Sequence, residues 1–270
     1  MKWSERQRAM LREMGIHLWP DSSHREPEPV SDTLAAPAPP DPPAAAPALK
    51  PRLVSAPAEP VLRAPPRAES GERPVGIETM DWPQLRAAVE GCRACRLCEG
   101  RTQTVFGTGS VQAQWMVVGE APGEQEDRQG EPFVGKSGQL LDAMLRAIQL
   151  TRGEAPVSQQ VFIANTVKCR PPGNRNPQPD ELAQCEPFLI RQIALLKPRL
   201  ILAMGRFAVQ SLLRSEEPVG RLRGRVHHYQ GVPLIVTYHP AYLLRNPEDK
   251  ARAWEDLCLA LETAQGGVAS

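Results

Sequence analysis

Four nearly continuous apolar runs most constrain the fold of this 270-residue chain. They span Trp115–Gly119, Val161–Val167, Leu200–Gly205 and Pro233–Tyr238, and aliphatic and β-branched residues dominate them. Strands buried on both faces of a parallel sheet have this composition, whereas half-exposed strands alternate apolar with polar residues. The runs therefore predict a central, mostly parallel, four-stranded sheet.

Helical patterns separate and follow these runs. They span Gln139–Gln149, Asp180–Leu196, Phe207–Leu213 and Pro247–Glu262. Strands that alternate with helices predict an α/β protein, here a three-layer α/β/α sandwich. Ligands of such sheets bind beyond the carboxyl ends of the strands. The segments that follow each strand are therefore the first places to look for a site.

Residues 76–265 hold these patterns, and the chain before them has a different composition. Fifteen of the 29 prolines lie between Pro20 and Pro74. Such a stretch buries too little apolar surface to offset its ordering entropy, so residues 20–75 are predicted to be a disordered, Pro/Ala-rich linker. Residues 1–19 predict a short amphipathic peptide that docks on a replication or repair protein; the alternative is an unstructured terminus.

Composition narrows the classes of function. The formal net charge is +1, so affinity for nucleic acid would need a local basic patch. No apolar run is long enough for a membrane helix, and residues 1–20 lack the apolar core of a secretion signal. We expect a cytoplasmic monomer without a membrane partner. Six cysteines in such a chain favour metal or redox chemistry over disulfides.

The segment after the first strand, Gly119–Asp127, contains two glycines, a proline and four carboxylates. Glycine and proline let a backbone turn sharply and approach a ligand closely. The next segment, Gly130–Gly138, holds Phe133 between glycines and a proline. A phenylalanine in such a loop predicts a stacking platform for a planar ring; the alternative is an aromatic side chain that caps the core.

Polar residues mark the second run. Asn165 lies inside it, where an unpaired polar side chain is unfavourable. An asparagine there can read the amide-like edge of a base, or it can be satisfied within the core. Arg170 and Arg175 follow in a Pro/Gly loop, where they can contact phosphate or simply be solvated.

His239 is the only one of the five histidines that ends a buried strand at the expected ligand face. Beyond it, Tyr242, Leu243 and Leu244 form an apolar tip with Arg245 beside them. Such a tip can wedge into stacked bases while the arginine holds a phosphate. The alternative is a hydrophobic staple that leads into the last helix.

The cysteines form two pairs. Cys92 and Cys95 have C-x2-C spacing, and Cys169 and Cys185 have C-x15-C spacing. Four thiolates in two pairs suit a [4Fe–4S] cluster or a structural zinc, and spacing does not choose between them. Cys98 repeats the first spacing and adds a fifth candidate.

Five motifs follow one another along the chain: GEAPGEQED, GEPFVGKSGQLL, NTVKCRPPGNRNP, LILAMG and HPAYLLRNP. Together they resemble the motifs of the family 4 uracil-DNA glycosylases. The resemblance covers roughly residues 92–261 and leaves out the N-terminal third. It implies an enzyme that flips uracil out of DNA and hydrolyses the N-glycosidic bond, leaving an abasic site for base excision repair.

The resemblance also implies a cofactor and a pocket lining. A [4Fe–4S] cluster would be held by Cys92, Cys95, Cys169 and Cys185. Family members need not have a cysteine at position 98, so Cys98 is left out of this set. The lining of the uracil pocket would include the backbone of Gly119, Ala121 and Gly123.

The remaining implied roles concern the base and the bond. Phe133 would stack on the flipped uracil, Asn165 would bind its edge, and His239 would approach the carbonyl next to the glycosidic nitrogen. Glu126 would lie near the C5 position, where a thymine methyl group would clash. Glu120 and Glu126 are both candidates to orient water or to stabilise the sugar cation, and the sequence does not decide between them.

Two other functions compete with this interpretation. A relative that captures uracil covalently carries, by resemblance, a basic loop ending in a reactive histidine; here the loop after Cys169 reads RPPGNRNPQPDE and has none. The second is a non-catalytic uracil-DNA binding or replication-associated Fe–S module. It would be recruited through residues 11–19, which resemble the start of the psi subunit of the bacterial clamp loader.

Overall fold

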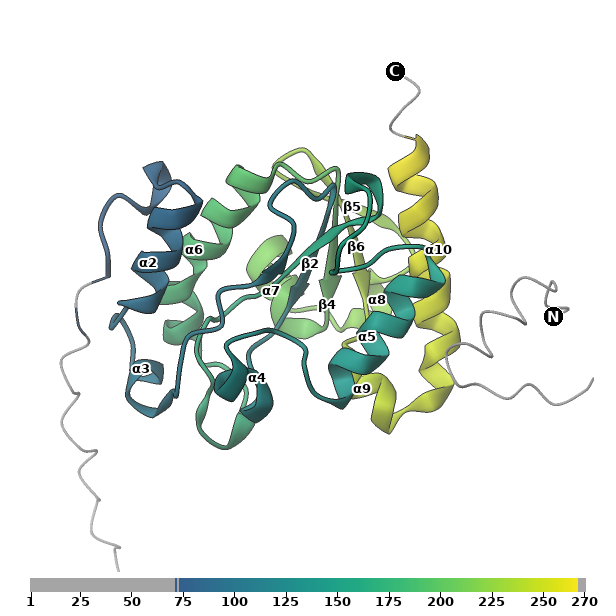
Figure 1. Cartoon of the computed structure of the whole chain (residues 1–270). Coiled ribbons are helices and arrows are strands. Elements are labelled where there is room, and N and C mark those ends of the chain that lie inside the picture. Colours follow the sequence, from purple (N-terminus) through teal and green to yellow (C-terminus); the bar gives the residue numbers. More distant parts are fainter. Residues whose placement is uncertain (1–70, 72, 267–270) are drawn as a thin grey trace, which may run out of the picture. The chain divides into compact units, whose positions relative to one another are not determined.

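The structure is a computed structural model that describes residue 71 and residues 73–266 (Figure 1). The predicted docking peptide and nearly all of the predicted linker lie outside the described residues. The helices and strands run from Ile77 to Gly266. None of the described helices has the length and apolarity that a membrane crossing requires.

A mixed six-stranded sheet lies at the centre of the described residues, with strand order β1-β3-β2-β4-β6-β5. The strands are β1 (Thr108–Gly109), β2 (Trp115–Gly119), β3 (Val161–Asn165), β4 (Leu200–Met204), β5 (Val226–Tyr229) and β6 (Val232–Thr237). The four predicted strands are β2, β3, β4 and β6, and their neighbours pair in parallel. The α/β class and the parallel centre are therefore confirmed.

Two antiparallel edge strands correct the predicted number of strands from four to six. β1 has only two residues, and β5 alternates exposed and half-buried side chains in the sequence VHHY. Neither has the continuous apolar run that marks a doubly buried strand. A continuous apolar run therefore marks only the buried centre of the sheet.

The sheet is covered by helices on both faces. The helices are α2 (Trp82–Glu90), α3 (Leu97–Gly100), α4 (Glu124–Gln129), α5 (Lys136–Ala147), α6 (Pro179–Leu196), α7 (Arg206–Leu213), α8 (Val219–Leu222), α9 (Pro240–Arg245) and α10 (Lys250–Gly266). Four 3-10 turns complete the described elements, at Ile77–Thr79, Val157–Gln159, Pro172–Asn174 and Pro247–Asp249.

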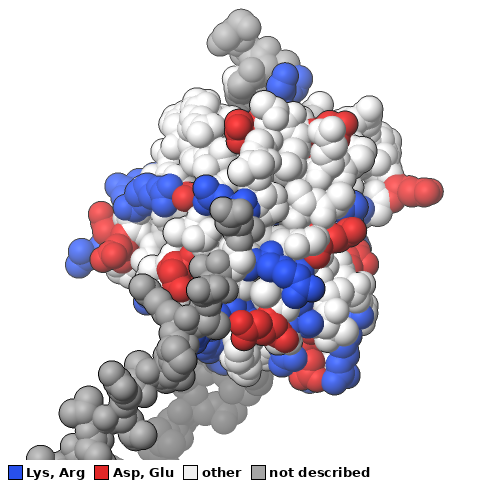
Figure 2. Space-filling model, turned by 90° about the vertical axis from the view of Figure 1, so that its left-hand side faces the viewer, with Lys and Arg blue, Asp and Glu red and all other residues white. Residues whose placement is uncertain are grey.

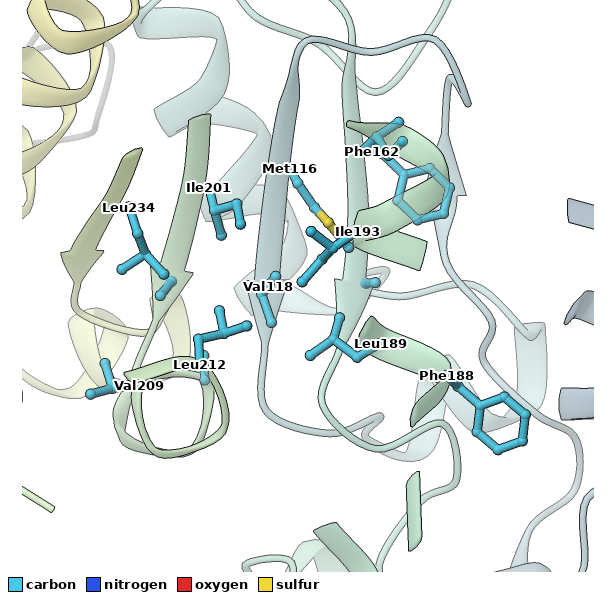
Figure 3. Close-up of a cluster of buried hydrophobic side chains, with 14 of the residues drawn as sticks. Met116, Val118, Phe162, Phe188, Leu189, Ile193, Ile201, Val209, Leu212 and Leu234 are labelled. Atoms are coloured by element: carbon cyan, nitrogen blue, oxygen red, sulfur yellow. The ribbon is translucent and has the colours of Figure 1, made fainter. Parts of the chain in front are cut away.

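Alternate residues of each central strand face opposite layers. In β2, Trp115 and Val117 pack with α5 and α10, whereas Met116 and Val118 pack with α2, α6 and α7. Figure 3 shows this second layer, in which Ile193 and Leu212 approach the sheet from the helices. Full burial of each such side chain contributes about 1.5–3 kcal/mol. The three-layer sandwich is therefore as predicted.

The parallel register brings the carboxyl ends of the central strands to one edge. Gly119 at the end of β2 pairs with Asn165 at the end of β3, and Met204 of β4 pairs with Thr237 of β6. The segments that leave these strands therefore meet at the same edge. This edge holds the residues that the sequence analysis singled out.

Candidate active site

A cavity of about 780 Å³ opens at the carboxyl ends of the central strands. It is bordered by most of the predicted base-site residues, namely Glu120, Ala121, Gly123, Glu126, Phe133, Asn165 and His239. Gly119 lies directly behind this wall, against the side chains of Asn165 and Phe133. Three regions that are far apart in the sequence, residues 119–133, 165 and 239, are thus brought together by the sheet register.

Phe133 is held in an unusual backbone conformation beside this cavity. Its φ is 56°, in the left-handed region that non-glycine residues rarely adopt, and its side chain is 5% exposed. A Cβ atom at Gly138, in the first turn of α5, would lie 1.7 Å from the carbonyl oxygen of Phe133, so glycine permits this close turn. The ring stacks toward His239 with centroids 5.4 Å apart. A phenylalanine strained in this way is consistent with a functional platform.

Asn165 presents an unpartnered polar atom at the same place. Its side chain is 2% exposed, and its Oδ1 has no hydrogen-bond partner among the described residues. A buried carbonyl oxygen without a partner costs about 1–3 kcal/mol. The amide borders the cavity, so a ligand with an N–H group can supply the missing partner.

His239 is a neutral imidazole with a defined tautomer. It caps the N-terminus of α9, where the main-chain N–H of Ala241 donates to Nδ1 at 3.2 Å. The proton of the neutral ring is therefore on Nε2. Burial lowers the pKa of His239 to about 4, and the nearby charge of Arg245 acts in the same direction. The ring can donate a hydrogen bond at neutral pH without carrying a charge.

The carboxylate of Glu126 accepts three main-chain hydrogen bonds. Oε2 accepts from the N–H of Gly123 at 3.1 Å, and Oε1 accepts from Val134 and Gly135 at 3.0 and 3.1 Å. Glu126 thereby joins the turn after β2 to the loop that carries Phe133. A carboxylate whose two oxygens are engaged in this way connects the two backbone segments.

Glu120 is the other predicted carboxylate, and its environment differs. Its side chain borders the cavity, and no hydrogen bond to its carboxylate is found among the residues described here. Burial raises the pKa of Glu120 to about 7, while the charge of Arg206 opposes this rise. A carboxyl group that titrates near neutral pH can exchange a proton during a reaction.

The predicted DNA contacts divide into exposed and engaged groups. Leu244 is 44% exposed, and Arg245 borders the cavity. Arg175 also borders the cavity but forms a two-pronged ion pair with the buried carboxylate of Glu181. Arg170 bonds Asn174 at 2.7 Å. Only part of the guanidinium groups of Arg170 and Arg175 is therefore available to a phosphate.

Leu243 corrects one prediction. It is 0% exposed and belongs to the apolar cluster under α5 and α10, so it does not reach DNA. The segment that carries the predicted apolar tip is the six-residue helix α9. One of two consecutive leucines on a helix turns inward, and here Leu244 is the outward one. Tyr242 borders the cavity, where it stacks on Tyr238 with centroids 5.1 Å apart.

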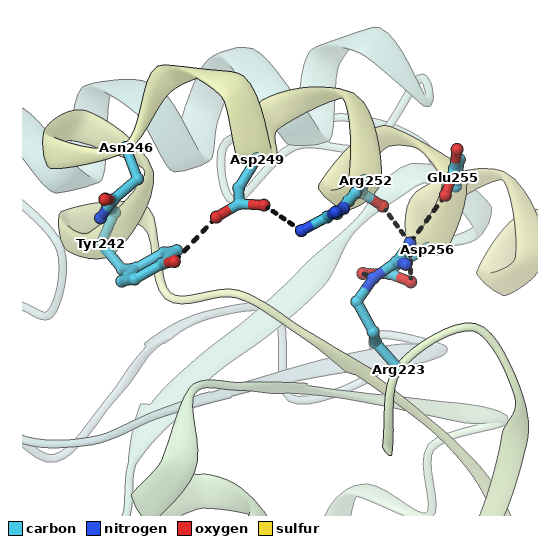
Figure 4. Close-up of polar contacts among 7 residues, drawn as sticks. All are labelled: Arg223, Tyr242, Asn246, Asp249, Arg252, Glu255 and Asp256. Carbon is cyan, nitrogen blue, oxygen red and sulfur yellow. Dashed lines mark hydrogen bonds and ion pairs between the residues drawn. The ribbon is translucent and has the colours of Figure 1, made fainter. Parts of the chain in front are cut away.

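A polar network joins α9 to the start of α10 (Figure 4). The hydroxyl of Tyr242 donates to Asp249 at 2.7 Å, and Arg252 holds the other oxygen of that carboxylate at 2.8 Å. Further along α10, Arg223 pairs with the fully buried Asp256 at 2.9 Å. The network anchors the helix that carries Leu244 to the last helix of the domain.

Arg206 and Gly205 belong to the site but were missed by the sequence analysis. Arg206 begins α7 and borders the cavity, and its charge opposes the rise in the pKa of Glu120. Gly205 has φ 85°, and a Cβ atom there would lie 3.0 Å from His239 Cβ. The motif LILAMG ends on this glycine, and its position after a buried strand was the available signal.

Five cysteines border a second, smaller cavity: Cys92, Cys95, Cys98, Cys169 and Cys185. The four predicted ligands are therefore brought together, and Cys98 joins them. Burial raises the pKa of Cys95 to about 11 and that of Cys185 to about 12, so a metal would have to displace protons from these thiols. Arg101 lies beside them, with Nη1 at 3.0 Å from Cys169 Sγ.

The arrangement of these thiols bears on the kind of metal group. Within residues 71 and 73–266, no three or more His, Cys, Asp or Glu side chains are grouped so that they could hold a metal ion. Tetrahedral zinc needs its ligands gathered at about 2.0–2.3 Å from one point. The five thiols border one cavity, and Arg101 lies beside them.

Charges of both signs cover the outer face that carries α2 and α6. Where the described residues are visible in Figure 2, basic and acidic side chains are interspersed, and no continuous basic surface forms. This agrees with the formal net charge of +1. Three arginines, Arg175, Arg206 and Arg245, border the main cavity.

Fold and cavity together define an α/β protein that can receive a planar, hydrogen-bonding ring at the carboxyl edge of its sheet. The profile of the Uracil DNA glycosylase superfamily matches residues 106–258. The Type-4 uracil-DNA glycosylase of Pyrobaculum aerophilum is 41% identical over 190 residues, covering 67% of this chain and 93% of that protein. This chain belongs to the type-4 branch of the uracil-DNA glycosylase superfamily.

Other relatives agree. The Type-4 uracil-DNA glycosylase of Sulfurisphaera tokodaii is 40% identical, with 64% of this chain and 80% of that protein covered. The Type-4 uracil-DNA glycosylase of Archaeoglobus fulgidus is 39% identical, with 64% and 86% covered. These relatives confirm the resemblance that was inferred from the five motifs.

Proposed function

We propose that this protein is a DNA glycosylase that excises uracil from DNA. The observation that carries the proposal is the buried, unpartnered Oδ1 of Asn165, a residue that borders the cavity together with Phe133 and the neutral ring of His239. Uracil in duplex DNA must leave the base stack before its glycosidic bond can be reached. A flipped uracil is a planar ring that can occupy this cavity. Its N–H group can supply the hydrogen-bond partner that Asn165 Oδ1 has not found among the residues that the structure describes.

The ring of uracil complements the three side chains. Its N3–H can donate to Asn165 Oδ1, while the amide nitrogen of Asn165 can donate to O4. Its O2 can accept from the Nε2–H of His239, and its face can stack on Phe133, which contributes about 1–3 kcal/mol. Cytosine has an acceptor at N3 and a donor at C4, so it would leave both groups of Asn165 mispaired.

Bond cleavage places negative charge on the departing uracil and positive charge on the sugar. Asn165 and His239 donate to the two oxygens over which the uracil charge spreads. Donors positioned in advance stabilise a developing anion without reorganisation at the moment of reaction. His239 acts as a neutral donor, because its pKa near 4 keeps the ring uncharged at neutral pH.

We assign the water-activating or cation-stabilising role to Glu120 rather than to Glu126. Glu126 is occupied by three main-chain N–H groups and positions the Phe133 loop. Glu120 borders the cavity with a pKa of about 7, so a large share of it is ionised at neutral pH. Its carboxylate can accept a proton from water or stabilise the sugar cation.

DNA contacts are proposed around the rim of the cavity. Leu244 would fill the space that the flipped base leaves, since it is the exposed apolar side chain of α9. Arg245, Arg175 and Arg206 border the same cavity and would contact phosphates. The polar network of Tyr242, Asp249 and Arg252 would hold α9, and with it Leu244, in position.

A [4Fe–4S] cluster is proposed for the cysteine cavity, held by Cys92, Cys95, Cys169 and Cys185. Such a cluster would brace the segment before the sheet against the loop after β3 and helix α6. The thiols border one cavity and two of them are contacted by Arg101 and by the main-chain N–H of Lys168, which supports an anionic group there. Localisation in the cytoplasm, a monomeric state and docking through residues 1–19 stay predictions.

The test is cleavage of an oligonucleotide that contains a single uracil, with thymine at the same position as the control. After incubation with the purified protein, alkali converts abasic sites into strand breaks. Breaks at uracil and not at thymine are the expected result. Binding without breaks would instead favour the alternative, a non-catalytic uracil-DNA binding module, and would overturn the proposed activity.

A further inference from the structure

Lys168 is a buried charged residue that the proposed chemistry does not use. It is 1% exposed and borders the cysteine cavity. Its Nζ donates to the main-chain oxygen of Asn165 at 2.7 Å and to Oε1 of Gln192 at 2.6 Å. Burial of a cation is unfavourable unless it is paired, so its position between these groups needs an explanation.

One side of Lys168 faces the cysteines. The residue precedes Cys169, and its main-chain N–H donates to Cys185 Sγ at 3.2 Å. Both hydrogen-bond acceptors of Nζ, the main-chain oxygen of Asn165 and Oε1 of Gln192, are neutral, so no carboxylate pairs with this buried side chain through them. Lys168 therefore contacts the cysteine site directly, through its main chain and as part of the cavity wall.

The other side of Lys168 faces the base cavity. Asn165 is the last residue of β3; it borders the cavity, and its side chain carries the unpartnered Oδ1. The bond from Nζ to its main-chain oxygen fixes the chain at the point where β3 ends. Gln192 continues the contact, since its Nε2 donates to the main-chain oxygen of Phe106 at 2.9 Å.

We propose that Lys168 is a positioning residue that holds Asn165 in register with the flipped base from the cysteine site. This inference rests on the proposed function, because it assigns the base-binding role to Asn165. Lys168 touches neither base nor sugar. It acts by orienting the peptide whose side chain does, and its loss misplaces a donor in the transition state.

The test uses two leaving groups. 5-Fluorouracil departs more easily than uracil because fluorine stabilises its anion, so its excision depends less on donors such as Asn165. A variant with a misplaced Asn165 should therefore lose more rate on uracil than on 5-fluorouracil. A variant that is only less stable should lose the same fraction of rate on both.

Lys168→Met removes the ammonium and keeps the length of the side chain. Gln192→Leu is the matched control, since it removes a member of the same buried network and leaves the Lys168–Asn165 contact in place. Single-turnover rates are measured with the full chain, and visible absorbance per chain reports whether the cysteine site is loaded. Lys168→Met should slow uracil excision about tenfold and 5-fluorouracil excision at most about twofold. Asn165→Ala should show the same direction of selectivity.

Equal losses on both bases in Lys168→Met, or an equal change of selectivity in Gln192→Leu, would overturn the positioning role. If Lys168→Met does not fold, the double variant Lys168→Met/Gln192→Leu replaces it, because exchange of both partners for apolar groups leaves fewer unpaired buried atoms. The same selectivity is expected there.

Calorimetric titration with free uracil separates this inference from the proposed function. A wild-type protein that binds uracil without cleaving DNA would overturn the activity alone. Lys168→Met would then still be expected to bind uracil about tenfold more weakly than Gln192→Leu does. Equal affinities of the two variants would overturn the positioning role.

Discussion

A Cβ atom at Gly119 would lie 2.5 Å from Asn165 Oδ1. The same atom would lie 2.6 Å from Cζ of Phe133. Both proposed base-binding side chains therefore pack directly against Gly119, where a larger residue would clash with them. Gly119→Ala should therefore displace both and lower the single-turnover rate on uracil by roughly 10²-fold or more. The measurement is excision of uracil from a single-stranded oligonucleotide under enzyme excess.

Gly100→Ala is the control for this substitution, because a Cβ atom there would meet no atom within 4 Å. It should leave the rate within about twofold of the wild type. A Gly119→Ala variant with normal excision would show that Asn165 and Phe133 do not need their present positions.

Glu126→Gln tests the brace between the turn and the Phe133 loop. An amide has one acceptor oxygen instead of two, so at least one of the three main-chain donors loses its partner. The free energy of unfolding should fall by about 1–3 kcal/mol, as expected for an unsatisfied buried donor. Urea titration measures it, with the half-exposed Glu124→Gln on the same helix as control. Equal stability of the two variants would contradict the brace.

Glu120→Gln separates a catalytic from a structural carboxylate by its dependence on pH. Burial raises the pKa of Glu120 to about 7 from the ordinary 4.5. If its ionised form acts, the wild-type single-turnover rate rises with pH through about 7 and then levels, whereas Glu120→Gln is slow by roughly 10²-fold and flat.

Stability should change in the opposite sense. A raised carboxyl pKa means that the folded protein binds the proton more tightly, so stability is lost as pH rises from 4.5 to about 7. Glu120→Gln should therefore unfold at a higher temperature than the wild type at pH 8. A variant that is both less stable and less active would argue against this assignment.

Leu244→Ala tests the proposed wedge on α9. Leu244 is 44% exposed, and its truncation removes apolar surface without opening a core cavity. Excision from duplex DNA should slow by about tenfold, whereas excision from a single strand, which needs less unstacking, should change at most about twofold. Val157→Ala, at a surface valine that is 43% exposed, is the control. Equal slowing on both substrates would contradict the wedge.

The centre of the fold could be predicted because its strands are buried on both faces. Val117 and Met116 are neighbours in sequence, yet both are fully buried, one against each layer of helices. Such strands leave a continuous apolar run. The edge strands β1 and β5 leave none, because each has one open edge and few buried side chains. These two strands can therefore be recognised only once the sheet is assembled.

The candidate site could be predicted where a polar or aromatic residue interrupts an apolar pattern. Asn165 and His239 stand out in this way, and both border the cavity. Lys168 and Gln192 do not, because their contact joins residues 24 positions apart and each looks like a surface residue in the sequence. Leu243 was assigned wrongly to DNA, because the sequence did not reveal the helical phase that turns it into the core.

His239→Gln tests whether the proposed donor is held neutral by its surroundings. Burial lowers the pKa of His239 from 6.5 to about 4. Below pH 6.5 the unfolded chain therefore takes up a proton that the folded protein does not, and stability is lost as pH falls toward 4 at up to about 1.4 kcal/mol per pH unit. His239→Gln cannot take up this proton in either state. Its thermal midpoint should therefore fall less than that of the wild type between pH 7.5 and pH 5.

The matched control for this last variant is His228→Gln, which changes an exposed histidine on β5. It should follow the wild-type dependence on pH. If His239→Gln and His228→Gln lose the same amount between pH 7.5 and pH 5, the imidazole of His239 is not held neutral by burial. The proposed hydrogen bond from a neutral His239 to uracil O2 would then be wrong. A charged imidazolium would instead be the group that stabilises the departing uracil.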